Sequence, residues 1–348
     1  MKKIILSLLV LLVAAVGSQA KSWKIGPSSV TGMDFASINA AMSSSLVTAG
    51  DTLYLDQYYN ESQEQTVTKR VVIIGTGYDT SFTDEQVVAR LTNSLNLKAA
   101  NTVVKSVRID NYIKLWAVNC TIERCYMTGF YVSSVLDTES HLYSCYIAGN
   151  VSGYGSSNYS KLDIQNCVIL QQVYYLTSSV LNNNVIYYNS GRNKLFTVHQ
   201  VDNSTITNNY IFGAGSDYYS YSDHWSWEYD LSAEVVGSGS GNTIEHNIFS
   251  RSSASYYPNN KFNGTTPTTF FICNGQYSDY YKLNKETGDN PAIGYATDGG
   301  DIGCHGGMFG CPSGGRPQYI PYFSKVVVGS RTENGKLPVS VTVKIQDE

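Results

Sequence analysis

One pattern of apolar and polar residues recurs through the middle of the chain. An aliphatic residue is followed by two polar residues, a Cys or Asn, any residue, and a second aliphatic or aromatic residue. Six segments follow it: IERCYM (122–127), LYSCYI (142–147), IQNCVI (164–169), LNNNVI (181–186), ITNNYI (206–211) and IEHNIF (244–249). A pattern that returns with a period in the low twenties is typical of a solenoid, in which successive repeats stack on one another.

Each repeat reads as short strands separated by polar turns. The segments lack the leucine-dense consensus and the helical turn of a leucine-rich repeat, which has a similar period. We therefore predict a parallel β-helix, in which equivalent positions of successive coils lie about 4.8 Å apart.

The fourth position of the pattern predicts a buried column. It is occupied, in chain order, by Cys125, Cys145, Cys167, Asn184, Asn209 and Asn247. A carboxamide at a tight inward turn can donate a hydrogen bond to one neighbouring coil and accept one from the other, so we expect the asparagines to form a ladder. The cysteines either continue the column as small buried side chains or form a metal or redox site, and we favour the column.

The two ends of the repeat region carry different patterns. Residues 31–42 (TGMDFASINAAM) place apolar residues at helical spacing, which predicts an amphipathic helix over the first coil. We place this N-terminal cap at residues 31–55, with a strand beginning in GDTLYL (50–55) and the next coil in RVVIIG (70–75). After residue 316, KVVVG, an Asn-Gly turn and the alternating LPVSVTVKI predict a β-hairpin tail at 317–348.

The first twenty residues have the pattern of an export signal. Lys2 and Lys3 precede an apolar run over residues 4–16, and the small-residue site Ser18-Gln19-Ala20 follows. The run is too short to span a bilayer comfortably. We therefore expect a signal peptide at 1–20 and an exported mature chain, periplasmic, cell-surface or extracellular, with no membrane span and with its β-helix domain at 21–316.

The ends of the repeat region also resemble a known superfamily. SWKIG, DFASINAAM, GDTLYL and VVIIGTGYD occur in that order near the N-terminus, and DYYKLNKETGDNPAIGYATDGGDIGCHGG (279–307) carries a Pro-Ala pair and an Asp-x-Gly-x-x-Gly-Gly element. These segments are similar to the first and last coils of secreted bacterial right-handed parallel β-helix proteins of the pectate-lyase-like superfamily. The resemblance covers most of the mature chain and implies a right-handed parallel β-helix. Together with the patterns at the two ends, it leads us to expect an all-β, single-stranded right-handed parallel β-helix with an N-terminal capping helix and a C-terminal β-hairpin tail.

Composition narrows the range of partners. The formal net charge is -4 and charged residues make up 15% of the chain, whereas Tyr alone numbers 28. No basic patch of the kind that binds nucleic acid is expected from this balance. We expect a monomer whose partner is a polysaccharide or another molecule of the cell surface.

Outward positions of the coils supply the first candidate site. Thr121, His141 and Asp163 form one predicted column, and Glu123 lies diagonally from His141 in the next. Glu123, His141 and Asp163 could perform acid and base catalysis or supply one set of calcium ligands. The alternative is that they are ordinary polar residues of an exposed β-wall.

A long insertion supplies the second candidate site. The spacing of 38 residues between Asn209 and Asn247 leaves an insertion at about 213–240. Aromatic faces flanked by carboxylates suit sugar rings, whose C–H faces stack on indole while hydroxyls find acceptors. The candidate ligand-binding residues are Tyr218, Tyr219, Tyr221, Asp223, His224, Trp225, Trp227 and Glu228. The alternative is that these aromatics cover the flank of the solenoid.

Catalytic motifs of the enzymes on this fold are missing. The sequence has no Asp-Asp pair and no Gly-His-Gly of the polygalacturonase type, and Asp223-His224 lies in an insertion rather than in a coil. The sequence therefore favours a protein that binds or scaffolds polysaccharide. The alternative is a polysaccharide lyase or glycoside hydrolase acting on an acidic glycan, with Ca²⁺ if it is a lyase.

Overall fold

The structure is a computed structural model of the chain. It describes residues 20–80, 87–133, 139–155, 160–188, 197–213, 236–237, 239–249, 259–262, 271–272, 282–285, 290–310, 315, 322–328 and 339–344.

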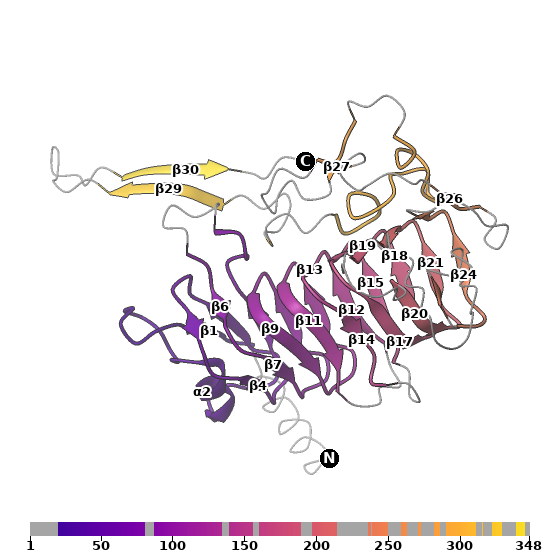
Figure 1. Cartoon of the computed structure of the whole chain (residues 1–348). Helices are drawn as coiled ribbons and strands as arrows, with labels where there is room; N and C mark the ends of the chain where they lie inside the picture. Colours follow the sequence, from indigo (N-terminus) through magenta and orange to yellow (C-terminus); the bar gives the residue numbers. More distant parts are fainter. Residues whose placement is uncertain are drawn as a thin grey trace, which may run out of the picture.

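The regular secondary structure of the described residues is almost entirely β, and most of the strands stack in two parallel sheets (Figure 1). The ten-stranded sheet contains, in spatial order, β1 (Ser22–Ile25), β2 (Thr52–Leu55), β5 (Val72–Ile74), β8 (Val103–Lys105), β10 (Thr121–Glu123), β12 (Ser140–Tyr143), β15 (Leu162–Gln165), β18 (Val180–Asn182), β21 (Thr205–Thr207) and β24 (Thr243–Glu245). Because the spatial order follows the chain order, each strand belongs to the next coil of a stack, which is consistent with a parallel β-helix solenoid.

The sixteen-stranded sheet supplies the rest of each coil. Its strands are β3 (Asn60–Glu61), β4 (Gln65–Val67), β6 (Arg90–Leu91), β7 (Leu95–Leu97), β9 (Arg108–Leu115), β11 (Tyr126–Val132), β13 (Tyr146–Ile147), β14 (Val151–Ser152), β16 (Val168–Ile169), β17 (Val173–Thr177), β19 (Val185–Tyr188), β20 (Val198–Asp202), β22 (Tyr210–Gly213), β23 (Val236–Gly237), β25 (Ile248–Phe249) and β26 (Lys261–Phe262). Strand β11 pairs with β13 through its first part and with β14 through its second. The sheet therefore divides into two walls after β11.

The repeat pattern determines the register between coils. The first aliphatic residues of the six segments are vertical partners, in the order Ile122, Leu142, Ile164, Leu181, Ile206 and Ile244. The first five of these side chains are fully buried and belong to one hydrophobic core. Alternate residues point outward because successive side chains of a strand face opposite ways.

A turn with a left-handed residue follows each strand of the ten-stranded sheet in this region. The residues at this position, with φ between 52° and 59°, are Arg124, Ser144, Asn166, Asn183, Asn208 and His246. Asparagine tolerates this backbone conformation better than most residues do. The next residue, such as Asn209 after Asn208, then points inward.

The inward asparagines form a hydrogen-bonded ladder. Nδ2 of Asn184 donates to Oδ1 of Asn209, and Nδ2 of Asn209 donates to Oδ1 of Asn247, both at 3.0 Å. Asn247 in turn donates to Asn260 at 3.0 Å, so the ladder is one coil longer than the sequence pattern predicts. At the other end, Oδ1 of Asn184 accepts from the backbone N–H of Cys167 at 2.9 Å.

A second internal ladder lies at the start of the same strands. The hydroxyl of Ser179 accepts from the backbone N–H of Leu162, and the hydroxyl of Ser204 accepts from the N–H of Ser179, both at 2.9 Å. Oδ1 of Asn242 continues it by accepting from Ser204 N–H at 2.9 Å. Both corners of the ten-stranded sheet are therefore held by polar side chains between coils.

The N-terminal helix is shorter than the sequence predicts. The predicted helix begins at residue 31, whereas α2 spans Ile38–Ser43. Phe35 instead forms a parallel bridge with Ile25, and the Ser37 side chain caps the helix by accepting from Ala40 N–H at 3.1 Å. The buried face of α2 joins the core of the first coils.

Two antiparallel pairs follow the parallel sheets. They are β27 (Phe271–Ile272) with β28 (Lys282–Leu283), and β29 (Tyr322–Val328) with β30 (Val339–Lys344), the latter drawn in yellow in Figure 1. Within the described residues, no helix has the length and apolar character that crossing a membrane requires.

Candidate functional site

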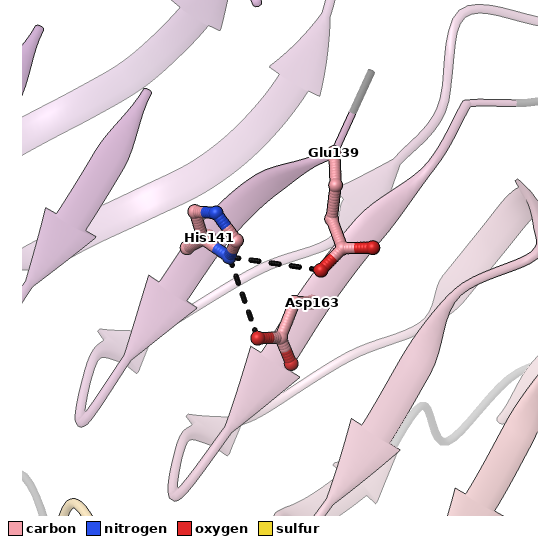
Figure 2. Close-up of side chains that lie close together, drawn as sticks. All are labelled: Glu139, His141 and Asp163. Carbon is pink, nitrogen blue, oxygen red and sulfur yellow. Dashed lines mark hydrogen bonds and ion pairs between the residues drawn. The ribbon is translucent and has the colours of Figure 1, made fainter. Parts of the chain in front are cut away.

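A histidine and two carboxylates meet on the outer face of the ten-stranded sheet (Figure 2). His141 in β12 and Asp163 in β15 are vertical partners in adjacent coils. Glu139 precedes β12 by one residue and lies on the same side as His141 because the two are two residues apart. We call Glu139, His141 and Asp163 the histidine cluster.

Hydrogen bonds orient the imidazole of His141. Its Nδ1 lies 3.3 Å from Oδ2 of Asp163 and 2.9 Å from the hydroxyl of Tyr143. The Tyr143 hydroxyl donates its one hydrogen to Oδ2 of Asp163 at 2.5 Å, so its oxygen is left to accept from Nδ1–H. The proton therefore resides on Nδ1, and Figure 2 shows the second ring nitrogen on the side away from both carboxylates.

The network holds Asp163 ionised. Burial alone would raise the pKa of Asp163, but hydrogen bonds from His141, Tyr143 and Gln165 outweigh it and lower the pKa below its usual value. The Gln165 bond, from Nε2 to Oδ1, measures 2.8 Å. The hydrogen bond to Asp163 in turn raises the pKa of His141. The pair is therefore stabilised as carboxylate and imidazolium.

Glu139, rather than Glu123, is the second carboxylate beside His141. Oε1 of Glu139 lies 3.8 Å from Nδ1 of His141, and Oε2 lies 3.1 Å from Nζ of Lys161. Glu123 forms ion pairs with Lys105 at 2.6 Å and Arg124 at 3.3 Å on its own part of the wall. The alternation of side chains before β12 is the signal that could have identified Glu139.

The segment 290–310 borders the histidine cluster. The Phe309 ring stacks on the Tyr143 ring at 3.9 Å with an interplanar angle of 7°. The Ser144 hydroxyl bonds to the backbone carbonyl of Phe309 at 2.9 Å. Tyr143 is therefore held from both sides, by the cluster and by this segment.

A second candidate surface lies on the wall formed by β9, β11, β14, β17 and β20. Tyr131, Ser152, Tyr174 and His199 are vertical partners in successive coils. The Tyr174 and His199 rings stack at 5.0 Å with an angle of 10°. We define the aromatic surface as Tyr112, Trp116, Tyr131, Tyr174, Tyr175 and His199.

The rings of the aromatic surface are partly exposed to solvent, and its one titratable imidazole is uncharged. Trp116, directly after β9, is 46% exposed, and the other members are half-buried. Burial lowers the pKa of His199, so this imidazole is neutral near pH 7. The sequence pattern misses this surface because its column includes Ser152 and follows no fixed residue type.

The chain was compared with protein-family models, with curated proteins and with solved structures. None of them matches it.

The predicted insertion site lies outside the described residues. Its candidate residues are Tyr218, Tyr219, Tyr221, Asp223, His224, Trp225, Trp227 and Glu228. Their role in ligand binding stays a prediction.

The three cysteines of the column are buried against backbone carbonyls. Sγ of Cys145 lies 3.4 Å from the carbonyl of Ile122, and Sγ of Cys167 lies 3.4 Å from that of Leu142. Burial raises the pKa of both Cys125 and Cys145 well above the usual value. These two thiols therefore stay protonated near pH 7, whereas a metal or redox site requires the thiolate.

Proposed function

We propose that this chain is an exported protein that binds polysaccharide on the outer wall of a parallel β-helix. The observation that supports the proposal is the aromatic surface. Rings on adjacent coils form two pairs, Tyr112 with Tyr131 at 4.9 Å and Tyr174 with His199 at 5.0 Å. Both pairs offer apolar faces and edges to the C–H faces of sugar rings. A polymer lying along the solenoid axis would meet these rings one after another.

The finer features of the fold belong to the same proposal. We infer a single-stranded, right-handed solenoid of the pectate-lyase-like kind over residues 21–316, because right-handed crossovers dominate parallel sheets. We further infer that α2 closes its N-terminal end, since its buried face joins the core of the first coils. The pattern of residues 1–20 supports export, and we propose that the mature chain is a monomer.

A glycan array and affinity electrophoresis test the proposal. Wild-type protein is expected to bind at least one polysaccharide, and Trp116→Ala combined with Tyr174→Ala is expected to weaken that binding at least about tenfold, the effect of losing about 1.4 kcal/mol. Tyr54→Ala is the matched control, because Tyr54 is 45% exposed on β2 of the other sheet. The array should contain acidic and neutral glycans, since Nζ of Lys98 lies 5.7 Å from the Trp116 ring centroid. No glycan signal with wild type would remove the proposal.

The insertion is tested separately. Trp225→Ala with Trp227→Ala should weaken binding of the same glycan if the insertion contributes to it. The affinity should be unchanged if the aromatic residues of the insertion only cover the solenoid. The first result would add the insertion to the binding surface, and the second would confine the surface to the described wall.

A second candidate function is a polysaccharide lyase or glycoside hydrolase at the histidine cluster. The outward ring nitrogen of His141 favours it, because above its raised pKa the imidazole is neutral, keeps its proton on Nδ1 and offers Nε2 as a base. A hydrolase also needs a carboxyl group that stays protonated, and the hydrogen bonds that lower the pKa of Asp163 make it unsuitable for that role. A lyase, with Ca²⁺ as possible cofactor, is the better enzymatic alternative.

Product formation separates binding from catalysis. Absorbance of unsaturated uronate products is followed on acidic polysaccharides, with and without Ca²⁺. The binding proposal predicts no product. A product signal that His141→Ala abolishes would replace binding with lyase activity as the function.

A further inference from the structure

The histidine cluster has a property that does not depend on polysaccharide binding. We propose that Glu139, His141 and Asp163 bind one divalent transition-metal ion, such as Zn²⁺ or Co²⁺. The ligand atoms are Oε1 of Glu139, Nδ1 of His141 and Oδ2 of Asp163.

The separations of the ligand atoms suit a small cation. Nδ1 of His141 lies 3.3 Å from Oδ2 of Asp163 and 3.8 Å from Oε1 of Glu139, and the three residues bring one ligand atom each within 4.8 Å of one another. Ligands arranged tetrahedrally at about 2.1 Å from zinc are about 3.4 Å from each other. The two distances from Nδ1 therefore need to change by only a few tenths of an ångström.

A second layer of hydrogen bonds holds the ligands in place. Asp163 accepts from Tyr143 through Oδ2 and from Gln165 through Oδ1, and Lys161 holds the outer oxygen of Glu139. Such partners orient metal ligands in proteins and strengthen binding. The strand register fixes His141 against Asp163, so Glu139 and the Tyr143 hydroxyl, which lies 2.9 Å from Nδ1, are the groups that must adjust.

A metal ion would also contact more of the ligand atoms than the hydrogen on Nδ1 does. The one hydrogen on Nδ1 faces Oδ2 of Asp163 and the Tyr143 hydroxyl, while Oε1 of Glu139 is beyond hydrogen-bond distance at 3.8 Å. A cation in place of this hydrogen would contact Nδ1 and both carboxylates at once. It would also reduce the repulsion between the two carboxylates, of which Glu139 already has Lys161 as a partner.

The donor set selects the class of metal. One imidazole nitrogen with two carboxylate oxygens suits zinc, cobalt and related ions, whereas Ca²⁺ takes six to eight oxygen ligands. The side chains of His141 and Glu139 are 29% and 27% exposed, so the ion has access from solvent and water can complete its coordination. Metal on Nδ1 leaves Nε2 protonated, so the metal-bound cluster would not act as a base there.

Titration of metal-stripped full-length protein tests the proposal. Isothermal titration with ZnCl₂ and visible absorption with CoCl₂ are expected to show one ion per chain. His141→Ala and, separately, Glu139→Gln are expected to weaken binding at least about tenfold. Glu123→Gln is the matched control, because Glu123 is a carboxylate of the same wall that is already paired with Lys105 and Arg124. Far-UV circular dichroism and thermal unfolding confirm that each variant is folded.

Several results would overturn the proposal. These are no binding by the wild type, unchanged affinity in both His141→Ala and Glu139→Gln, or an equal loss in Glu123→Gln. A thiolate-to-cobalt charge-transfer band would place the ion on cysteine instead. Because the readout is binding of the metal alone, failure here leaves the polysaccharide proposal intact, and failure of the glycan array leaves the metal site intact.

Discussion

Asparagine has two different roles at neighbouring positions of one coil. Asn208 adopts a φ of 59° at the turn, and Asn209 points inward and bonds to both adjacent coils. The inward role can be predicted from the sequence, because a polar residue repeated between apolar positions requires partners of its own kind. The turn role of Asn208 could not be predicted. Arg124 and Ser144 occupy the same left-handed turn position in other coils, so no single residue type marks it.

The ladder predicts a large cost for removing a single amide. In Asn209→Ala, the buried N–H groups of Asn184 lose their acceptor and the carbonyl of Leu181 loses a donor. Each buried group left unsatisfied costs about 1–3 kcal/mol, so the free energy of unfolding should fall by about 3 kcal/mol or more. Chemical denaturation measures it. Thr205→Ala, on the exposed side of the same strand, is the control and should change stability by less than about 0.5 kcal/mol.

The pair of His141 and Asp163 predicts a pH window of stability. The pKa of His141 is raised, so its contribution is present below its unfolded value of about 6.5 and is lost as pH rises through the folded value. The pKa of Asp163 is lowered, so its contribution is present above about 3.9 and is lost as pH falls through the folded value. Both contributions are therefore present together between about pH 4 and pH 6.5.

Denaturation of His141→Gln at two pH values measures this effect. The variant should lose more stability relative to wild type at about pH 5.5 than at about pH 8.5. His199→Gln is a control of opposite sign, because burial lowers the pKa of His199 and its protonation destabilises the fold. An equal loss for His141→Gln at both pH values would show that the pair does not titrate as described.

Among the secondary-structure elements, α2 begins later than the apolar spacing of its sequence predicts. The apolar spacing in residues 31–42 predicts a helix, but the backbone N–H groups of Asp34 and Phe35 both bond to the carbonyl of Lys24. Those bonds tie this part of the segment to β1, so the helix begins only after Ser37. Periodicity identified the buried face of the helix, and tertiary hydrogen bonds determined its start.

The cap of α2 predicts a measurable effect on stability. Ser37→Ala removes the acceptor for Ala40 N–H and should lower the free energy of unfolding by about 1 kcal/mol. Ser43→Ala is the matched control, because the exposed Ser43 hydroxyl donates to the carbonyl of Asn39 one helical turn earlier and should contribute little. If Ser37→Ala and Ser43→Ala have the same free energy of unfolding, the side chain of Ser37 does not cap the helix.

The second internal ladder, in which serine hydroxyls accept hydrogen bonds at the start of the strands, could not be predicted from the repeat. Its column contains Cys120, Ser140, Leu162, Ser179 and Ser204 immediately before or at the start of each strand. The hydroxyls bond to backbone N–H groups of the preceding coil, so a residue without a polar side chain, such as Leu162, can interrupt the column. A sequence template that demands one residue type therefore misses it.

At the scale of the whole molecule, parallel stacking was the most predictable property. The repeat places His141 directly beside Asp163, and the structure has this register. Glu139 was missed because it precedes its strand, and the aromatic surface was missed because outward positions vary from coil to coil. The inward positions follow a template because they share one core, whereas the outward positions need only suit their own neighbours.

The proposed polysaccharide lies along the solenoid and crosses several coils. Tyr131 and His199 are three coils apart, which corresponds to about 14 Å. Calorimetric titration with oligosaccharides of increasing length, made from whichever glycan the array identifies, measures this directly. Affinity should rise with each added sugar until the ligand covers these coils and then level off, and Tyr174→Ala should shift the whole series to weaker binding. An affinity already maximal for a monosaccharide, or a series unaffected by Tyr174→Ala, would show that no polysaccharide binds along these coils.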